Sequence, residues 1–310
     1  MLNWIKSITA IATVALVSAC GGGDDSPHSN IVQTAQANSQ FSILVEAVTA
    51  ADLGTTLSGT GPFTVFAPTN DAFAKLLTEL NITKAALLAN KPLLTAVLTY
   101  HVLPGQVLKA NIKPGLANAT VQGDIFKVDA KAADLVITDG RNRTSKITAT
   151  DILTTNGVIH QIDTVLLPAD KTIVQTAIAS APEFSILVEA VVAAGLADTL
   201  SGKGPFTVFA PTNAAFAAAL TELGLTKAQL LANVPLLTKV LTYHVVSGRV
   251  LKAGVPVGTP INTVQGEAFT VSAALAITDK RARVANIVAT DVLTSNGVIH
   301  VIDKVILPAP

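Results

Sequence analysis

Four histidines are the side chains in this sequence best suited to chemistry, and they form two pairs: His101 with His160, and His244 with His300. An imidazole can bind a metal ion or transfer a proton, but a metal site needs further Cys, His, Asp or Glu ligands nearby. No closely spaced cluster of that kind accompanies these histidines in the sequence. Each lies among apolar neighbours, as in YHVL and GVIHQID. We therefore expect packed, hydrogen-bonded histidines and no metal site or cofactor.

The motifs of nucleophilic and phosphate chemistry are also missing from the sequence. There is no G-x-S-x-G elbow, and the single cysteine, Cys20, lies near the N-terminus. The segment LSGKG (200–204) resembles part of a phosphate-binding loop, but Gly rather than Ser or Thr follows Lys203. The sequence therefore predicts a protein that is not an enzyme. A hydrolase would require a pocket with converging Ser, His and carboxylate groups.

Two short basic stretches, DGRNRTSK (139–146) and DKRARVAN (279–286), are the remaining charged candidates. Such a cluster could contact an acidic glycan or a phosphate surface, although the acidic residues beside it weaken its field. A solvated hairpin loop is the interpretation we favour. The whole chain carries 21 basic and 21 acidic residues, so its charge does not indicate nucleic-acid binding.

These residues recur because the sequence repeats. The decapeptide GPFTVFAPTN occurs at 61–70 and again at 204–213, and TATDILTTNGVIHQID in the first half matches VATDVLTSNGVIHVID in the second. Each unit is long enough to bury its own core, and far longer than a solenoid repeat. We expect two globular domains, residues 31–169 and 171–310, joined near 167–172 by a short linker.

The first part of each unit is expected to be mostly helical. In the first copy, apolar residues at helical spacing predict a helix over 41–53, and FTVFA at 63–67 predicts a strand that Pro68 ends. Thr69 or Asn70 can then cap a second helix. The decapeptide is therefore explained as a strand, a proline stop and a helix cap in succession.

The second part of each unit is expected to be β-structure. YHVL at 100–103 predicts a strand, and β-type patterns follow from about residue 120. Asn156 and Gly157 between apolar runs predict a hairpin. Helices followed by strands, without regular alternation, indicate an α+β fold with an antiparallel sheet.

At these residues the sequence resembles the fasciclin family, whose unit is the FAS1 domain. The similar segments are TVFAPTN followed by AF, the YH dipeptide between apolar flanks, and the terminal NGVIHxID hairpin, all present in both copies. The resemblance covers nearly all of residues 30–310. It implies an α+β wedge of packed β-sheets with several helices. It also implies a non-catalytic adhesion module that binds cells, matrix or other surface proteins.

The resemblance further implies adhesion residues, namely an Asp-Ile type pair before the last hairpin and the Tyr-His pair. In this sequence they are Asp151, Ile152, Tyr100 and His101 in the first copy, and Asp291, Val292, Tyr243 and His244 in the second. The other interpretation is structural: Asp151 caps a turn, and Ile152 and Tyr100 belong to the core.

The N-terminus resembles a bacterial lipoprotein signal. Residues 1–20 contain Lys6, an apolar run and the ending VSAC, which is similar to a lipobox with Cys20 as the lipid-attachment site. Residues 21–30 are expected to form a flexible tether. By resemblance, Gly21 directly after the cysteine favours the outer membrane; which face the domains occupy stays open.

The function expected from these observations is a lipid-anchored binding or adhesion protein of the cell envelope. Its partner would be a cell-surface or matrix protein or glycan, and its contact with the membrane would be through the N-terminal lipid. The alternative is a periplasmic structural or ligand-binding lipoprotein that is not exposed to the exterior.

Overall fold

The computed structural model describes residues 29–132 and 134–310. Cys20, the expected signal peptide and all but the last two residues of the expected tether lie outside the described residues. Within the described part of the chain, no helix is both long and apolar enough to cross a bilayer.

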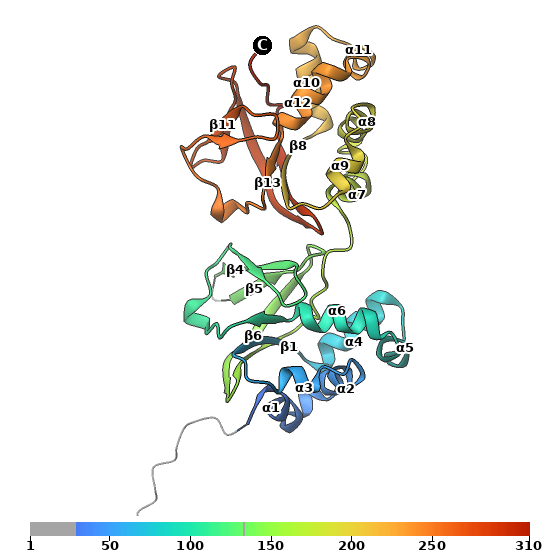
Figure 1. The fold of residues 1–310 in the computed structure, drawn as a ribbon, viewed down its shortest axis with the longest axis vertical. Helices are drawn as coiled ribbons and strands as arrows, with labels where there is room; N and C mark the ends of the chain where they lie inside the picture. The colour runs from blue at the N-terminus through green and yellow to red at the C-terminus, as the bar shows by residue number, and fades with distance from the viewer. Residues whose placement is uncertain (1–28, 133) are drawn as a thin grey trace, which may run out of the picture.

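Two units with the same order of elements follow one another along the long axis of the molecule (Figure 1). In domain 1 the elements are α1 (Ile31–Ala37), η1 (Ser39–Phe41), α2 (Ser42–Ala50), α3 (Gly54–Leu57), β1 (Phe63–Pro68), α4 (Asn70–Leu80), α5 (Lys84–Ala89), α6 (Lys91–Tyr100), β2 (Val102–Pro104), η2 (Lys109–Asn111), β3 (Ala117–Ala119), β4 (Ile125–Lys131), β5 (Asp134–Thr138), β6 (Thr144–Thr154) and β7 (Gly157–Ile162).

Domain 2, all of whose residues the structure describes, repeats this order with small changes in length and without a counterpart of η1. Its elements are α7 (Ile173–Ala179), α8 (Ser185–Ala193), α9 (Ala197–Ser201), β8 (Phe206–Pro211), α10 (Asn213–Leu223), α11 (Lys227–Ala232), α12 (Val234–Tyr243), β9 (Val245–Ser247), η3 (Lys252–Gly254), β10 (Ile261–Asn262), β11 (Ala268–Val271), β12 (Ala276–Thr278), β13 (Val284–Thr294) and β14 (Gly297–Ile302).

Each domain contains one seven-stranded sheet, with the order β2-β1-β7-β6-β5-β4-β3 in domain 1 and the equivalent order in domain 2. All neighbours are antiparallel except β1 and β7, which run parallel from Phe63 opposite Gly157 to Pro68 opposite Ile162. The predicted α+β class is confirmed, but the sheet is mixed rather than antiparallel throughout. Parallel neighbours need a long connection, and here it includes α4–α6 and most of the sheet.

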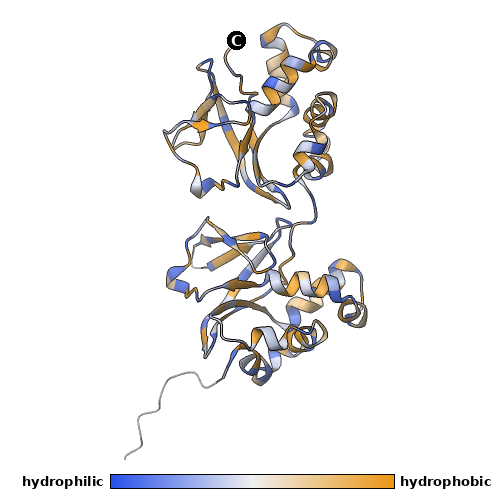
Figure 2. Cartoon of the chain, viewed as in Figure 1, coloured by the Kyte–Doolittle hydropathy of each residue, from blue (hydrophilic) through white to orange (hydrophobic). Residues whose placement is uncertain are grey.

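The helices lie on the same side of the molecule in both domains, with the sheet on the other side (Figure 1). Apolar residues occur on the helices and along the strands that face them (Figure 2). Domain 1 has one core between the helices and the sheet and a second within the folded sheet. In the second core Phe66 packs edge-on against Phe126, with ring centroids 5.0 Å apart. Domain 2 repeats this pair with Phe209 and Phe269.

Most helices begin at a residue whose side chain caps the helix N-terminus. Thr69 is the N-cap of α4 and Thr83 the N-cap of α5, and each side chain accepts a hydrogen bond from a backbone N–H of the first turn. The predicted strand over 100–103 starts later: Tyr100 is the last residue of α6, His101 is its C-cap, and β2 begins at Val102. A short apolar run cannot be separated from the end of a buried helix by periodicity alone.

The predicted hairpin at Asn156 and Gly157 joins β6 to β7, with Gly157 as the first residue of β7. The Asn156 side chain accepts from the N–H of Ile31 at 2.9 Å and donates to the carbonyls of Leu57 and Gly59, both at 2.8 Å. Gly157 is needed because a Cβ there would lie 2.0 Å from the carbonyl oxygen of Phe63 in β1. The last hairpin is therefore hydrogen-bonded through Asn156 to the start of its own domain, a contact that we call the clasp.

Candidate functional site

The Asp-Ile type pairs lie in β-bulges of the long strands β6 and β13. We call residues 149–153 and 289–293 the bulge segments; the strand register shifts once just before residue 149 or 289 and again within each segment. Asp151 has φ of 59° and Asp291 has φ of 61°, in the left-handed region that Asp tolerates better than most residues. The bulge turns this stretch away from the regular ladder.

In domain 1 a histidine and an aspartate fix the bulge. The Asp151 carboxylate accepts from the N–H of Lys109 at 2.8 Å, and the Asp151 N–H donates to Nδ1 of His160 at 3.2 Å. Nε2 of His160 lies 2.8 Å from the carbonyl oxygen of Val107 and donates to it. Both ring nitrogens are therefore committed to backbone groups. Burial lowers the pKa of His160, which favours the neutral ring that this arrangement requires.

Domain 2 builds the same bulge with equivalent residues. Asp291 accepts from the N–H of Lys252 at 2.7 Å and donates its own N–H to His300, whose other nitrogen meets Val250 at 2.9 Å. Burial also lowers the pKa of His300. The two bulges therefore have the same internal hydrogen bonds.

They differ in what covers them. The second oxygen of Asp291 accepts a hydrogen bond from Lys127 of β4 in domain 1, at 3.0 Å. This ion pair is nearly buried, since the two side chains are 14% and 3% exposed. Burial pulls the pKa of Lys127 down, but its hydrogen bond and ion pair with Asp291 hold that pKa above its ordinary value. In residues 29–132 and 134–310, no cation pairs with Asp151.

An amide side chain adds a second contact between the domains. Asn142, in the loop after β5, donates to the carbonyl of Leu293 at 3.1 Å and accepts from its N–H at 2.7 Å. It pairs with Leu293 as a neighbouring strand would. The Leu293 side chain packs with Leu251 and Val298, and Ile125 of β4 lies against this cluster. Leu293 is 3% exposed, whereas its counterpart in domain 1, Leu153, is 50% exposed.

We call the region formed by each bulge segment, the start of the 3-10 helix that precedes it in the chain (η2 or η3) and the adjacent residue of the last strand the docking face of that domain. In domain 2 the docking face consists of Leu251, Lys252, Asp291, Leu293 and Val298, and it is covered by domain 1. The corresponding residues of domain 1 are Leu108, Lys109, Asp151, Leu153 and Val158, of which Val158 is buried within its own domain. Figure 1 shows β4 at the boundary between the domains, where this contact forms.

The remaining members of the Asp-Ile pairs belong to the cores. Ile152 and Val292 are half-buried and pack against the helix-side core of their domains. This agrees with the structural interpretation, which placed Ile152 in the core. In the domain 1 segment Leu153 is exposed and Asp151 is partly exposed, whereas Asp291 and Leu293 in domain 2 are buried.

The Tyr-His pair of domain 1 is buried. The hydroxyl of Tyr100 donates to the carbonyl of Ile125 at 2.6 Å. His101 donates from Nδ1 to the carbonyl of Val97 at 2.7 Å and accepts at Nε2 from the N–H of Leu166 at 2.9 Å. Burial, with a smaller contribution from a nearby arginine, lowers the pKa of His101 to about 4.

Domain 2 treats its pair in the same way. Tyr243 and His244 are both buried, and burial lowers the pKa of His244 to about 4. Burial also raises the pKa of Tyr243 to about 12. These four side chains, which the resemblance suggested for adhesion, are buried in this structure, and the tyrosine hydroxyls join α6 and α12 to the sheet of their domains.

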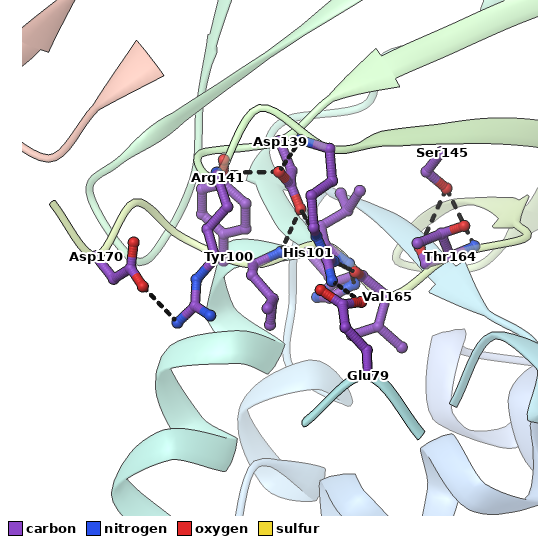
Figure 3. Close-up of polar contacts among 12 residues, drawn as sticks. Glu79, Tyr100, His101, Asp139, Arg141, Ser145, Thr164, Val165 and Asp170 are labelled. Carbon is purple, nitrogen blue, oxygen red and sulfur yellow. Dashed lines mark hydrogen bonds and ion pairs between the residues drawn. The ribbon is translucent and has the colours of Figure 1, made fainter. Parts of the chain in front are cut away.

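The basic stretch 139–146 is neutralised by carboxylates, as the close-up in Figure 3 shows. Arg143 pairs with Asp139 and Glu79. Arg141 lies 3.4 Å from Asp170 (Figure 3). In domain 2, Arg283 pairs with Asp279 and Glu222. These arginines brace loops against helices and do not form an exposed cationic patch. Among the described residues no cluster of three or more His, Cys, Asp or Glu side chains could hold a metal ion.

The fold defines a class of protein built from two tandem α+β domains, each with a mixed seven-stranded sheet and packed helices, and comparison with known proteins identifies the family. Residues 39–168 and 182–308 each match the Fasciclin domain family. The chain belongs to the fasciclin domain family, with two domains in tandem, as the sequence predicted.

Relatives include bacterial and animal proteins. The chain is 43% identical over 140 residues to protein sll1483 of Synechocystis, an alignment that covers 44% of this chain and 73% of that protein. It is 30% identical over 255 residues to transforming growth factor-beta-induced protein ig-h3 of Sus scrofa. That alignment covers 81% of this chain but only 35% of ig-h3, so the animal protein is much longer than the part it shares.

A solved structure of a FAS1 domain pair from the insect cell adhesion molecule Fasciclin I is also similar. It is 21% identical in sequence, with a TM-score of 0.43, and the match covers 84% of this chain and 95% of that one.

Proposed function

We propose that this chain is a non-catalytic binding protein of the adhesion type, anchored in a bacterial cell envelope by a lipid on Cys20. Its partner is a protein or glycan of a cell surface or matrix, bound at the docking face of domain 1. Membership of the fasciclin family supports the class of function. The commitment of both nitrogens of each core histidine to backbone groups supports a non-catalytic role.

The exposure of Leu153 beside Asp151 is the observation that carries this proposal. An apolar side chain half exposed next to a carboxylate that pairs with no cation of the described residues offers a partner both buried apolar area and an ion pair. The same two groups in domain 2, Leu293 and Asp291, already bind another surface within this chain. The docking face therefore makes a contact in domain 2, and in domain 1 its leucine is exposed to solvent.

Binding of the purified two-domain chain to intact cells tests the proposal. Leu153→Asp should lower binding at least about tenfold, because burying an added carboxylate at a contact is unfavourable. Val192→Asp on α8 is the matched control, since Val192 is 61% exposed and lies far from the bulge segment in the sequence. Equal binding by L153D and V192D would reject the docking face as the adhesive surface.

Anchoring and exposure need separate experiments. Cys20→Ser should move the protein from the membrane fraction to the soluble fraction, and persistence in the membrane pellet would contradict lipid attachment. Protease treatment of intact cells, with lysed cells as control, then reports the face. Loss of the domains from intact cells supports adhesion, whereas full protection supports the alternative of a periplasmic structural or ligand-binding lipoprotein.

A further inference from the structure

We propose that the docking face of domain 1 binds a fasciclin domain of a different chain, one that carries a lysine and an asparagine where domain 1 has Lys127 and Asn142. This inference rests on the proposed function and names the class of partner for that site. The contact would repeat, between chains, the contact that the two domains already make within this chain.

The covered docking face of domain 2 is the template. We call the three residues of domain 1 that cover it the donor edge: Ile125, Lys127 and Asn142. Lys127 neutralises the buried Asp291, Asn142 pairs with the backbone of Leu293, and Ile125 completes the apolar cluster. Each type of group on the docking face thus has one matching group on the donor edge.

Domain 1 presents the same groups without a cover. One oxygen of Asp151 accepts from the N–H of Lys109, as one oxygen of Asp291 accepts from Lys252, so the other carboxylate oxygen is left for a cation in both domains. The bulge geometry is also the same, because the same histidine contact sets it in each. Leu153 is exposed where Leu293 is buried.

The chain also enters both domains in the same way. The N–H of Thr155 donates to the carbonyl of Ser29, at 3.0 Å, and the N–H of Ser295 donates to Lys171 in the linker, at 2.9 Å. Ser29 therefore lies against the last hairpin of domain 1 as Lys171 of the linker lies against that of domain 2, where the face remains accessible to the donor edge.

A second copy of this chain is not the occupant, because it has no donor edge to offer. The donor edge of domain 1 is already used by its own domain 2. At the equivalent positions domain 2 has Ala268, Thr270 and Ala282. Neither a cation for Asp151 nor an amide for the backbone of Leu153 is present there. The partner is consequently a fasciclin domain of another protein that retains both groups.

Introducing the donor-edge side chains into domain 2 allows the inference to be tested with this chain alone. The triple variant Ala268→Ile, Thr270→Lys, Ala282→Asn gives domain 2 a donor edge, so copies should associate head to tail. We expect sedimentation velocity to show concentration-dependent association at least about tenfold stronger than that of the unmodified chain, and weakening as salt screens the new ion pair. Thermal melting of each variant checks that it is folded.

Adding Leu153→Asp to the triple variant should abolish the association, while adding Val192→Asp should leave it unchanged. A folded triple variant that stays monomeric, or association that survives L153D, overturns the inference. Association of the unmodified chain that L153D abolishes also overturns it, because a second copy would then be the occupant without lysine or asparagine.

The two proposals fail differently. If L153D abolishes binding to cells but the triple variant stays monomeric, the face is adhesive and its partner is not a fasciclin domain. If the triple variant associates through Leu153 but L153D binds cells normally, the face docks fasciclin domains and the cell-binding surface lies elsewhere.

Discussion

The bulge segments of the two domains are alike in every internal contact and opposite in their surroundings. Asp151 and Asp291 have nearly the same φ and each binds a histidine and the start of a 3-10 helix. Of the two aspartates, only Asp291 pairs its carboxylate with a lysine side chain of the described residues, and of the two leucines only Leu293 is covered. The shape of this segment is thus set by the domain that contains it, whereas its availability is set by the neighbouring domain. Copies with the same motif can therefore differ in function.

Lowering the pH should reduce the stability of both domains equally, because each contains the same buried histidine. This equal effect is the baseline against which the differences between the bulge segments are measured. His101 and His244 have pKa values of about 4 in the folded protein against about 6.5 when unfolded. The folded state binds fewer protons than the unfolded state. The contribution of the two neutral histidines to the free energy of unfolding is therefore complete above about pH 6.5 and is lost as the pH falls towards 4. Each histidine contributes about 3 kcal/mol to this change. NMR titration of the ring protons of His101 and His244 should give pKa values near 4. A pKa near 6.5 for either histidine would contradict its burial.

Truncating the leucine of each bulge segment should separate the two copies most clearly among single substitutions. Leu293→Ala should lower the free energy of unfolding of domain 2 by about 3 kcal/mol, because it opens a cavity in a packed cluster. Leu153→Ala should change that of domain 1 by less than about 0.5 kcal/mol, because the side chain is already half exposed. Denaturant titrations followed by circular dichroism measure both. Equal effects would mean that the docking face of domain 2 is not covered in solution.

Removing the interdomain lysine should have the next largest effect. Lys127→Met leaves the Asp291 charge without its partner at a site that is nearly dry, and should weaken the docking of the domains by about 2 kcal/mol. Small-angle scattering should then show a larger radius of gyration. Lys146→Met is the control, because its ion pair with Asp134 is exposed. A variant at Lys127 that scatters like the control would show that this pair does not hold the domains together.

The smallest effect is expected at the position that corresponds to Asn142. Ala282 has φ of 58°, a conformation that strains alanine but that asparagine adopts more readily. Ala282→Asn should therefore stabilise domain 2 by about 0.5 kcal/mol even without a partner. Differential scanning calorimetry can detect the change. A lower melting temperature would mean that the two loops differ in more than this residue.

Sequence patterns predicted the parts of the fold that depend on neighbours in the chain. Thr69 and Thr83 could be placed as helix caps because capping is a hydrogen bond within one turn. The parallel pairing of β1 with β7 could not, because it joins strands separated by most of the domain. The sequence did not predict that α6 continues to Tyr100, because the apolar pattern of the helix runs directly into that of the following strand.

The candidate site was predicted in part. Asp151 and Asp291 could be named from the family resemblance, but their difference depends on Lys127 and Asn142, which lie far away in the sequence and in another domain. A signal for these two residues existed: they are positions at which the otherwise similar copies differ, with Thr270 and Ala282 as counterparts. Burial of the Tyr-His pair could be suspected from the apolar flanks and needed the structure to place it.

The clasp made by Asn156 has a mechanical consequence. It ties the first helix of domain 1 to the tip of the hairpin whose long strand carries Leu153. If a lipid holds the N-terminal side and a partner pulls at the docking face, tension passes from residue 29 through the backbone contact at Thr155 into that hairpin. The load path then bypasses most of the helix-side core of domain 1 and all of domain 2. Under force, the hydrogen bonds of one hairpin tip would fail before either domain had to unfold.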